Sequence, residues 1–78
     1  MHNSVAVYQI RIEGELDQRW STWFSGLKVS LDEGPEGFQT TLLTGELDQA
    51  ALRGVLNKIW DLNLVLISLS QIDEPEIN

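Results

Sequence analysis

Carboxylates are the side chains of this 78-residue chain that are numerous enough to suggest chemistry, with twelve acidic residues against five basic ones. Grouped carboxylates can bind Ca²⁺ or Mg²⁺, and paired ones catalyse glycoside hydrolysis. None of the groups has the ligand spacing of an EF-hand, and a domain this small offers little room for a sugar-binding cleft. We interpret two groups as flanking helix N-termini, one as a turn and one as a tail. We therefore assign no metal, cofactor or catalytic residue to these groups: Glu13-Glu15-Asp17, Asp32-Glu33-Glu36, Glu46-Asp48 and Asp73-Glu74-Glu76.

Other catalytic residue types are scarce. The chain has no cysteine, which excludes disulfides, thiolate metal sites and cysteine nucleophiles. Its single histidine, His2, lies beside the first residue, so one chain cannot build a Ser-His-Asp triad or a multi-histidine metal site. An enzyme is therefore the least favoured class of function.

The charge of the chain limits its partners. A net charge of −7 has the wrong sign for binding nucleic acid or an anionic membrane surface. The first residues lack the pattern of a signal peptide, and no apolar run approaches the roughly 20 residues that span a bilayer. We expect a cytoplasmic protein with neither nucleic acid nor membrane as a partner.

A pentapeptide, Gly-Glu-Leu-Asp-Gln, occurs twice, at Gly14–Gln18 and again 31 residues later at Gly45–Gln49. Each copy lies between a strand-like and a helix-like segment. Glycine relieves crowding where a strand ends, and aspartate is a favoured N-cap of a helix. The repeat therefore predicts two equivalent halves, with Asp17 matched to Asp48.

Hydrophobic periodicity predicts the elements on either side of these repeats. Alternation from Tyr8 to Ile12 indicates a strand, and the turn residues 33–37 indicate a hairpin. Asn63 is suited to end the second helix in a left-handed conformation. Two helical stripes are expected to face the core: Trp20, Trp23, Phe24 and Leu27, then Leu52, Val55, Leu56 and Ile59.

The resulting order, βαββαβ, predicts an α+β protein with a ferredoxin-like two-layer sandwich, in which a four-stranded antiparallel sheet carries two helices on one face. Three strands with a helix-turn-helix are the alternative. We expect one domain at residues 5–72, with flexible termini at 1–4 and 73–78.

The chain also resembles a family of short, uncharacterised bacterial proteins. The resemblance runs from Tyr8 to Leu69 and is carried by a Trp-x-x-Trp-Phe helix at Trp20–Phe24 and by Leu42–Leu56, which is similar to the family's Leu-x-Gly-x-Leu-x-Asp-Gln-Ala-Ala-Leu segment. Asn63 and Arg53 stand where that family often has glycine and histidine. The resemblance implies the fold and transfers no functional residue.

Two common uses of the ferredoxin-like fold are excluded, because metal chaperones need a cysteine pair and RNA-recognition modules need sheet aromatics in a basic setting. We predict a non-enzymatic protein-interaction module that self-associates. The alternative is a regulatory, ACT-like domain that binds a small ligand through a glycine-containing first loop, for which Gly14–Asp17 is a weak match.

Side chains alternate between the two faces of each strand, and this alternation (strand parity) predicts where self-association occurs. With Val65, Ile67 and Leu69 facing the helices, the opposite face of the sheet stays uncovered, and a homodimer would form there. The alternative is a monomer, which the polar residues on that face favour. An edge strand is a further possible contact between copies. Trp60 lies at the margin of the second helix's apolar stripe, where it meets the sheet edge or a partner. A different protein is the alternative partner. The predicted interface consists of Val5, Val7, Phe38, Leu42, Leu66 and Ile72.

Overall fold

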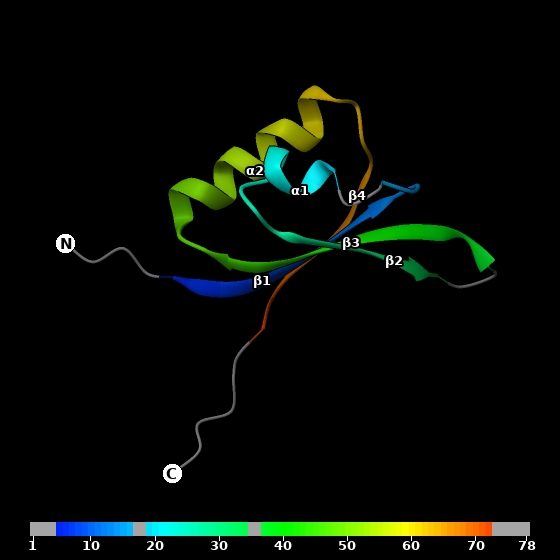
Figure 1. The fold of residues 1–78 in the computed structure, drawn as a ribbon, viewed down its shortest axis with the longest axis horizontal. Coiled ribbons are helices and arrows are strands. Elements are labelled where there is room, and N and C mark those ends of the chain that lie inside the picture. Colours follow the sequence, from blue (N-terminus) through cyan, green and yellow to red (C-terminus); the bar gives the residue numbers. More distant parts are fainter. Residues whose placement is uncertain (1–4, 17–18, 35–36, 73–78) are drawn as a thin grey trace, which may run out of the picture.

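The computed structural model describes residues 5–16, 19–34 and 37–72. Both helices lie on the same side of one antiparallel sheet, whose strand order is β2-β3-β1-β4 (Figure 1). The predicted ferredoxin-like βαββαβ sandwich is therefore confirmed. Its elements are β1 (Ala6–Glu13), α1 (Trp20–Trp23), β2 (Lys28–Glu33), β3 (Gln39–Leu47), α2 (Gln49–Asp61) and β4 (Leu66–Ile72).

The hydrophobic core fills the space between the helices and the sheet. In β1, every second residue from Tyr8 to Ile12 is buried, as the alternating pattern predicted. From α2, the side chains of Leu52, Val55 and Ile59 enter the same core. The core is completed by Phe24, Leu27, Val29, Leu43 and Leu47.

Short-range signals specify the hairpin between β2 and β3. The amide of Gly34 donates to the carbonyl of Phe38 over 2.6 Å, and the amide of Gly37 donates back to the carbonyl of Gly34 over 3.2 Å. Gly37 has a φ of 81°, a conformation that favours glycine. The predicted hairpin is confirmed, although positions 35 and 36 lie outside the described residues.

Both ends of α2 follow the prediction. Asp48 is the N-cap, and its Oδ1 accepts a 2.7 Å hydrogen bond from the amide of Ala51. At the other end Asn63 has a φ of 59°, and the two amides after the C-cap donate to the carbonyls of Ile59 and Trp60 over 3.0 Å. This pattern is a Schellman motif, which closes a helix by binding its last free carbonyls.

The first helix is shorter than its hydrophobic stripe predicted. It has four residues, because Ser25 and Gly26 both take positive φ values and turn the chain towards β2. Phe24 and Leu27 reach the core from outside the helix, whereas the side chain of Trp23 is 49% exposed. The prediction that Trp23 belongs to the core is therefore wrong.

The two pentapeptides do not adopt equivalent structures. Gly14 follows the end of β1 with a φ of 96°, whereas Gly45 lies inside β3 and is paired with β1. A side chain at Gly45 would collide with Leu27, since an added Cβ would lie 2.7 Å from its Cδ2 atom. The predicted equivalence of the two halves is therefore wrong in its local geometry, and Asp17 lies outside the described residues.

A register shift in β4 changes which of its residues face the helices. The pairing with β1 shifts at the step from Arg11 to Ile12, where a β-bulge places Leu66 opposite Ile12. Leu66 consequently packs against the core, although it was predicted to lie on the open face. Ile67 and Val65, predicted to face inwards, are exposed, while Leu69 stays on the helix side.

Candidate functional site

The open face of the sheet, opposite the helices, is more polar than strand parity suggested. Val7 and Ile72 pair with each other at one end of this face, and Phe38 lies beyond its other end, 67% exposed. Leu42 is half-buried near the centre, and Val5 is exposed just before β1. A row of four polar residues crosses the sheet between the Val7–Ile72 pair and Leu42, so the predicted patch is interrupted; the row consists of Lys28, Thr44, Gln9 and Ser70.

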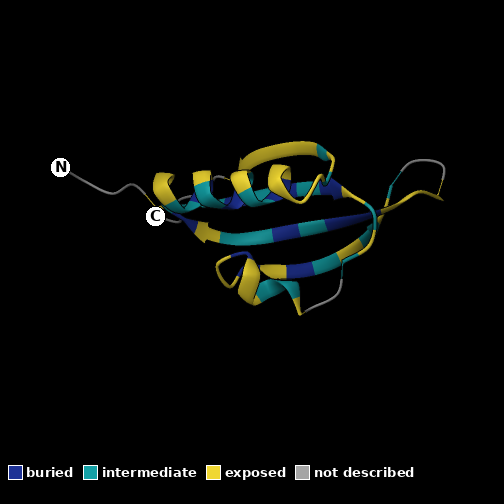
Figure 2. Ribbon diagram, turned by 90° about the horizontal axis from the view of Figure 1, so that it is seen from above, coloured by how far each residue is buried: buried dark blue, intermediate teal, exposed yellow. Residues whose placement is uncertain are grey.

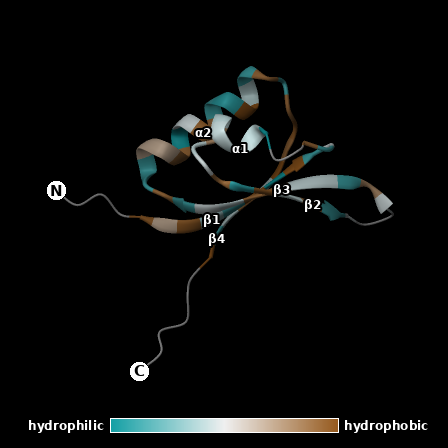
Figure 3. Cartoon of the chain, in the orientation of Figure 1, coloured by the Kyte–Doolittle hydropathy of each residue, from teal (hydrophilic) through white to brown (hydrophobic). Residues whose placement is uncertain are grey.

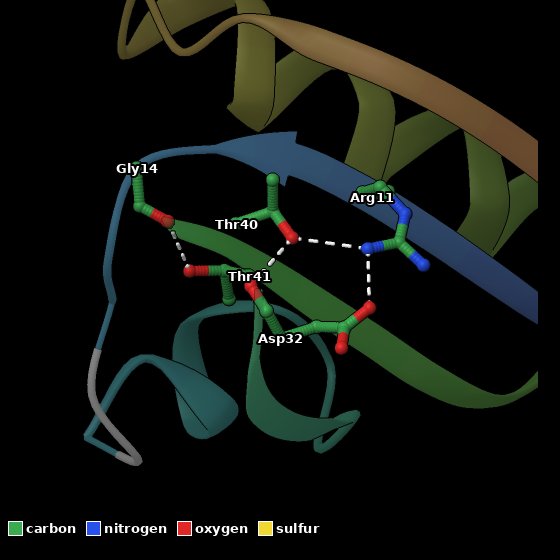
Figure 4. Close-up of polar contacts among 5 residues, drawn as sticks. All are labelled: Arg11, Gly14, Asp32, Thr40 and Thr41. Carbon is green, nitrogen blue, oxygen red and sulfur yellow. Dashed lines mark hydrogen bonds and ion pairs between the residues drawn. The ribbon is translucent and has the colours of Figure 1, made fainter. Parts of the chain in front are cut away.

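A polar cluster on the same face links three neighbouring strands (Figure 4). Nη1 of Arg11 donates to Oδ2 of Asp32 over 2.5 Å and to Oγ1 of Thr40 over 3.0 Å. The hydroxyl of Thr40 in turn donates to the backbone carbonyl of Asp32 over 2.9 Å. Both charged side chains are partly solvated, so the ion pair contributes little to stability beyond fixing strand positions. Strand parity could have revealed this cluster, because it places all three side chains on one face.

Thr41 holds the connection between β1 and α1 from the helix side of the sheet. Its buried hydroxyl donates to the carbonyl of Gly14 over 2.8 Å (Figure 4). The same oxygen accepts from the amide of Leu16 over 2.9 Å. Buried backbone groups need such partners. The role of Thr41 is therefore structural.

The acidic groups singled out in the sequence do not converge in the part of the chain that the structure describes. There, no cluster of three or more His, Cys, Asp or Glu residues is arranged to hold a metal ion. Asp48 caps α2 and Asp32 binds Arg11, so both carboxylates have structural partners. Among the described residues, no helix is long and apolar enough to cross a membrane.

Exposed apolar side chains gather instead around β4. Figure 2 shows this strand as almost continuously exposed, and Figure 3 shows a strongly hydrophobic segment running from the end of α2 towards it. Of the ten exposed large apolar side chains among the described residues, six belong to this region. We call them the β4 surface: Trp60, Leu62, Val65, Ile67, Leu69 and Ile72.

β4 forms one edge of the sheet, and six of its seven residues are exposed. Leu69 is 41% exposed, although it pairs with Ile10, which is completely buried. Leu69 is therefore exposed because its strand lies at the edge of the sheet, and not because its side chain points away from the helices.

A groove runs along the flank of α2 that faces away from α1. The opposite flank faces α1, because Nζ of Lys58 donates to the carbonyl of Trp23 over 2.8 Å and lies 5.3 Å from the centre of its indole ring. The groove has a volume of about 410 Å³, and Gln49, which lines it, donates from Nε2 to the Tyr8 hydroxyl over 2.7 Å. Tyr8 lies in β1, between Gly45 of β3 and Gln71 of β4, so this flank begins over β1.

A second hollow of about 680 Å³ lies at the hairpin end of the sheet. Its lining includes the exposed side chains of Phe38 and Ile67. Glu13 and Gly14, at the end of β1, also line it. The hollow is therefore mainly apolar, with one carboxylate at its margin.

Comparison with protein-family models matches residues 7–70 to the family described as "Domain of unknown function (DUF8691)". The match covers most of the chain, which therefore belongs to this family. Searches of curated proteins and of solved structures gave no match.

Proposed function

We propose that this member of the DUF8691 family is a non-enzymatic interaction module that self-associates. The observation that supports the proposal is the β4 surface, where six exposed apolar side chains lie between Trp60 and Ile72 at one edge of the sheet, with polar residues between them. Soluble proteins rarely expose large contiguous apolar patches except where they bind something. Closed twofold dimers are the commonest products of self-association.

The polar groups of the molecule favour binding over catalysis. Arg11, Asp32 and Thr40 bind one another across the sheet, Thr41 binds two backbone groups, and Asp48 caps a helix. Each of these contacts fixes the fold. The exposed apolar side chains of the β4 surface have no comparable structural task.

The mass of the protein in solution tests the proposal. We expect light scattering and sedimentation equilibrium to show a discrete species of twice 8.8 kDa as the concentration rises through the micromolar range. A mass of 8.8 kDa at every concentration would refute self-association. A continuous series of larger masses would also contradict it, because non-specific aggregation has no closed symmetry.

Binding of a small regulatory ligand is the second candidate, and the hollow beside Gly14 favours it. ACT-like domains use a glycine-containing loop after their first strand, and Gly14 occupies that place here. A thermal-shift screen of the twenty amino acids tests this function, since a ligand that binds only the native state raises the melting temperature. A shift retained by Phe38→Ala would exclude the hollow as the binding site, because Phe38 lines it.

A further inference from the structure

We propose that two copies of the chain associate by pairing their β4 strands antiparallel, which joins the two sheets into one continuous sheet of eight strands. This inference rests on the proposed self-association and specifies the surface and the geometry through which it occurs. It replaces the open face of the sheet with the β4 edge as the site of contact.

The backbone of β4 provides the first argument. Among the described residues, β1 is the only strand that pairs with β4, because β4 ends the sheet order. In an antiparallel edge strand, the outward amide and carbonyl groups have no strand to bind and act as a template for a further strand. The regular part of β4 beyond its β-bulge, residues 68–72, is therefore available for pairing.

The two edges of the sheet differ in charge, and this difference selects β4. The other edge strand, β2, carries Lys28, Asp32 and Glu33 among its six residues, and charges on an edge strand oppose pairing. The sequence of β4, Leu-Ile-Ser-Leu-Ser-Gln-Ile, contains no charged residue. In a chain with a net charge of −7, two copies repel each other least where neither copy carries charge.

The helix side of β4 supplies apolar surface to the same contact. Leu69 projects to this side, which also carries Leu56 and the 54% exposed Trp60 on α2. A twofold axis through the centre of the paired strands brings Leu69 of both copies together on this side. The groove along each α2 then opens towards its counterpart in the other copy.

We place Leu69 opposite Leu69 of the second copy, because this register buries the 41% exposed side chain of Leu69 against its counterpart. The segment paired around the twofold axis, Ser68–Ser70, lies beyond the β-bulge. Ser68 then faces Ser70 of the second copy, and residues that are directly opposed lie on the same face of a sheet. Both serines are exposed, and both lie on the open face of their own sheet, paired with Arg11 and Gln9.

Charge pairs at the two serines test the pairing and its register together. In the double variant Ser68→Glu/Ser70→Glu, every introduced carboxylate faces another across the twofold axis, and we expect the dimer dissociation constant to rise roughly tenfold. In Ser68→Glu/Ser70→Lys, every carboxylate faces an ammonium group, and we expect the dimer to be at least as stable as the parent. The second variant also retains the net charge of −7.

A matched control separates local pairing from overall charge. Thr22→Glu/Ser30→Glu adds the same two negative charges on the α1 and β2 side, at residues outside the core, and its dissociation constant should stay close to that of the parent. Leu42→Lys, on the open face, should also leave the dimer intact. Circular dichroism spectra of all variants establish that each one is folded before its mass is measured.

Hydrogen exchange of the unmodified protein provides an independent measurement. Outward amides of β4 exchange rapidly in a monomer, and we expect peptides covering 66–72 to gain protection as concentration rises, while those covering β2 do not. A dimer that forms without this protection, or that survives Ser68→Glu/Ser70→Glu unchanged, would overturn the edge pairing and leave self-association standing. A dimer lost in Leu42→Lys alone would assign the contact to the open face, whereas a parent chain that is monomeric throughout would refute both proposals.

Discussion

Replacing Gly45 by alanine tests how closely the sheet packs against the start of β2. An added Cβ would lie 2.7 Å from Cδ2 of Leu27, well inside van der Waals contact. Leu27 is 2% exposed and has little space to withdraw, and Gly45 is fixed by its place in β3. Inserting a methyl group into a packed core costs about 1–3 kcal/mol of folding free energy. We therefore expect Gly45→Ala to destabilise the protein by about that amount, which lowers the melting temperature by roughly 4–8 °C per kcal/mol in a domain of this size.

Gly54→Ala is the matched control, because it makes the same chemical change where space is open. Gly54 lies inside α2, and no atom lies within 4 Å of the Cβ that alanine would add. Alanine is favoured over glycine in a helix interior by about 1 kcal/mol, so this variant should be more stable than the parent. Urea denaturation, followed by tryptophan fluorescence at one protein concentration, measures both effects, and their signs should be opposite.

A second variant separates the proposed clash with Leu27 from any general destabilisation by alanine at this position of β3. Leu27→Val removes the atom that the new methyl group would strike, so adding Gly45→Ala to this variant should cost much less than it costs in the parent. Equal costs in both backgrounds would show that Leu27 is not the constraint. Unchanged stability of Gly45→Ala in the parent would refute the close packing itself.

Three further predictions concern the local contacts. Asp48→Ala should lower the unfolding free energy by about 1 kcal/mol because the amide of Ala51 loses its acceptor, whereas Asp48→Asn should lose less; equal denaturation midpoints for the parent and both variants would contradict the cap. Phe24→Ala should lower the unfolding free energy by about 3–5 kcal/mol and Trp23→Ala by much less, since Phe24 is fully buried and Trp23 is exposed. Similar losses in the two variants would show that Trp23 does contribute to the core. Thr41→Val should cost about 1–3 kcal/mol in the same denaturation assay because two partly buried backbone groups lose their partner, and an unchanged midpoint would contradict its bridging role.

The parts of the fold that the sequence predicted correctly are those that depend on neighbouring residues. The N-cap at Asp48, the left-handed Asn63 and the glycines of the β2–β3 hairpin all act within a few positions of their own place in the chain. Alternation in β1 is equally local, since it requires one buried face and nothing more. Together these signals were sufficient for the element order and hence for the fold.

The sequence predictions failed where a distant residue decides the local structure. Identical pentapeptides differ in conformation because Gly45 is pressed against Leu27, whereas Gly14 has open space around the same position. The stripe that placed Trp23 in the core assumed a helix continuing to Leu27, but the positive φ of Ser25 ends that helix early. Periodicity registers spacing along the chain and carries no information about either constraint.

One residue of the predicted open-face interface, Leu66, was misplaced for a similar reason, because the alternation of side chains was counted through a β-bulge. The register shift opposite the Arg11–Ile12 step turns Leu66 into the core, and it removed one residue of the predicted interface from the open face. The polar cluster around Arg11 removes much of the remaining hydrophobic character of that face. The sequence does permit the charges of each edge strand to be counted, and this count distinguishes the uncharged β4 from the charged β2.

The unequal helices connect the fold to the proposed contact. An α-helix with its side chains is about 10 Å wide, whereas neighbouring strands are about 4.8 Å apart, so one helix covers roughly two strands. Here α2 has thirteen residues but α1 has only four, so the helical layer is smaller than two full helices. The edge strand β4 is covered incompletely, with Leu66 packed against the core and Leu69 41% exposed on the helix side. The described residues contain no further helix to place there, and in the proposed dimer a second copy joined edge to edge would supply cover without bringing charged residues of β4 together.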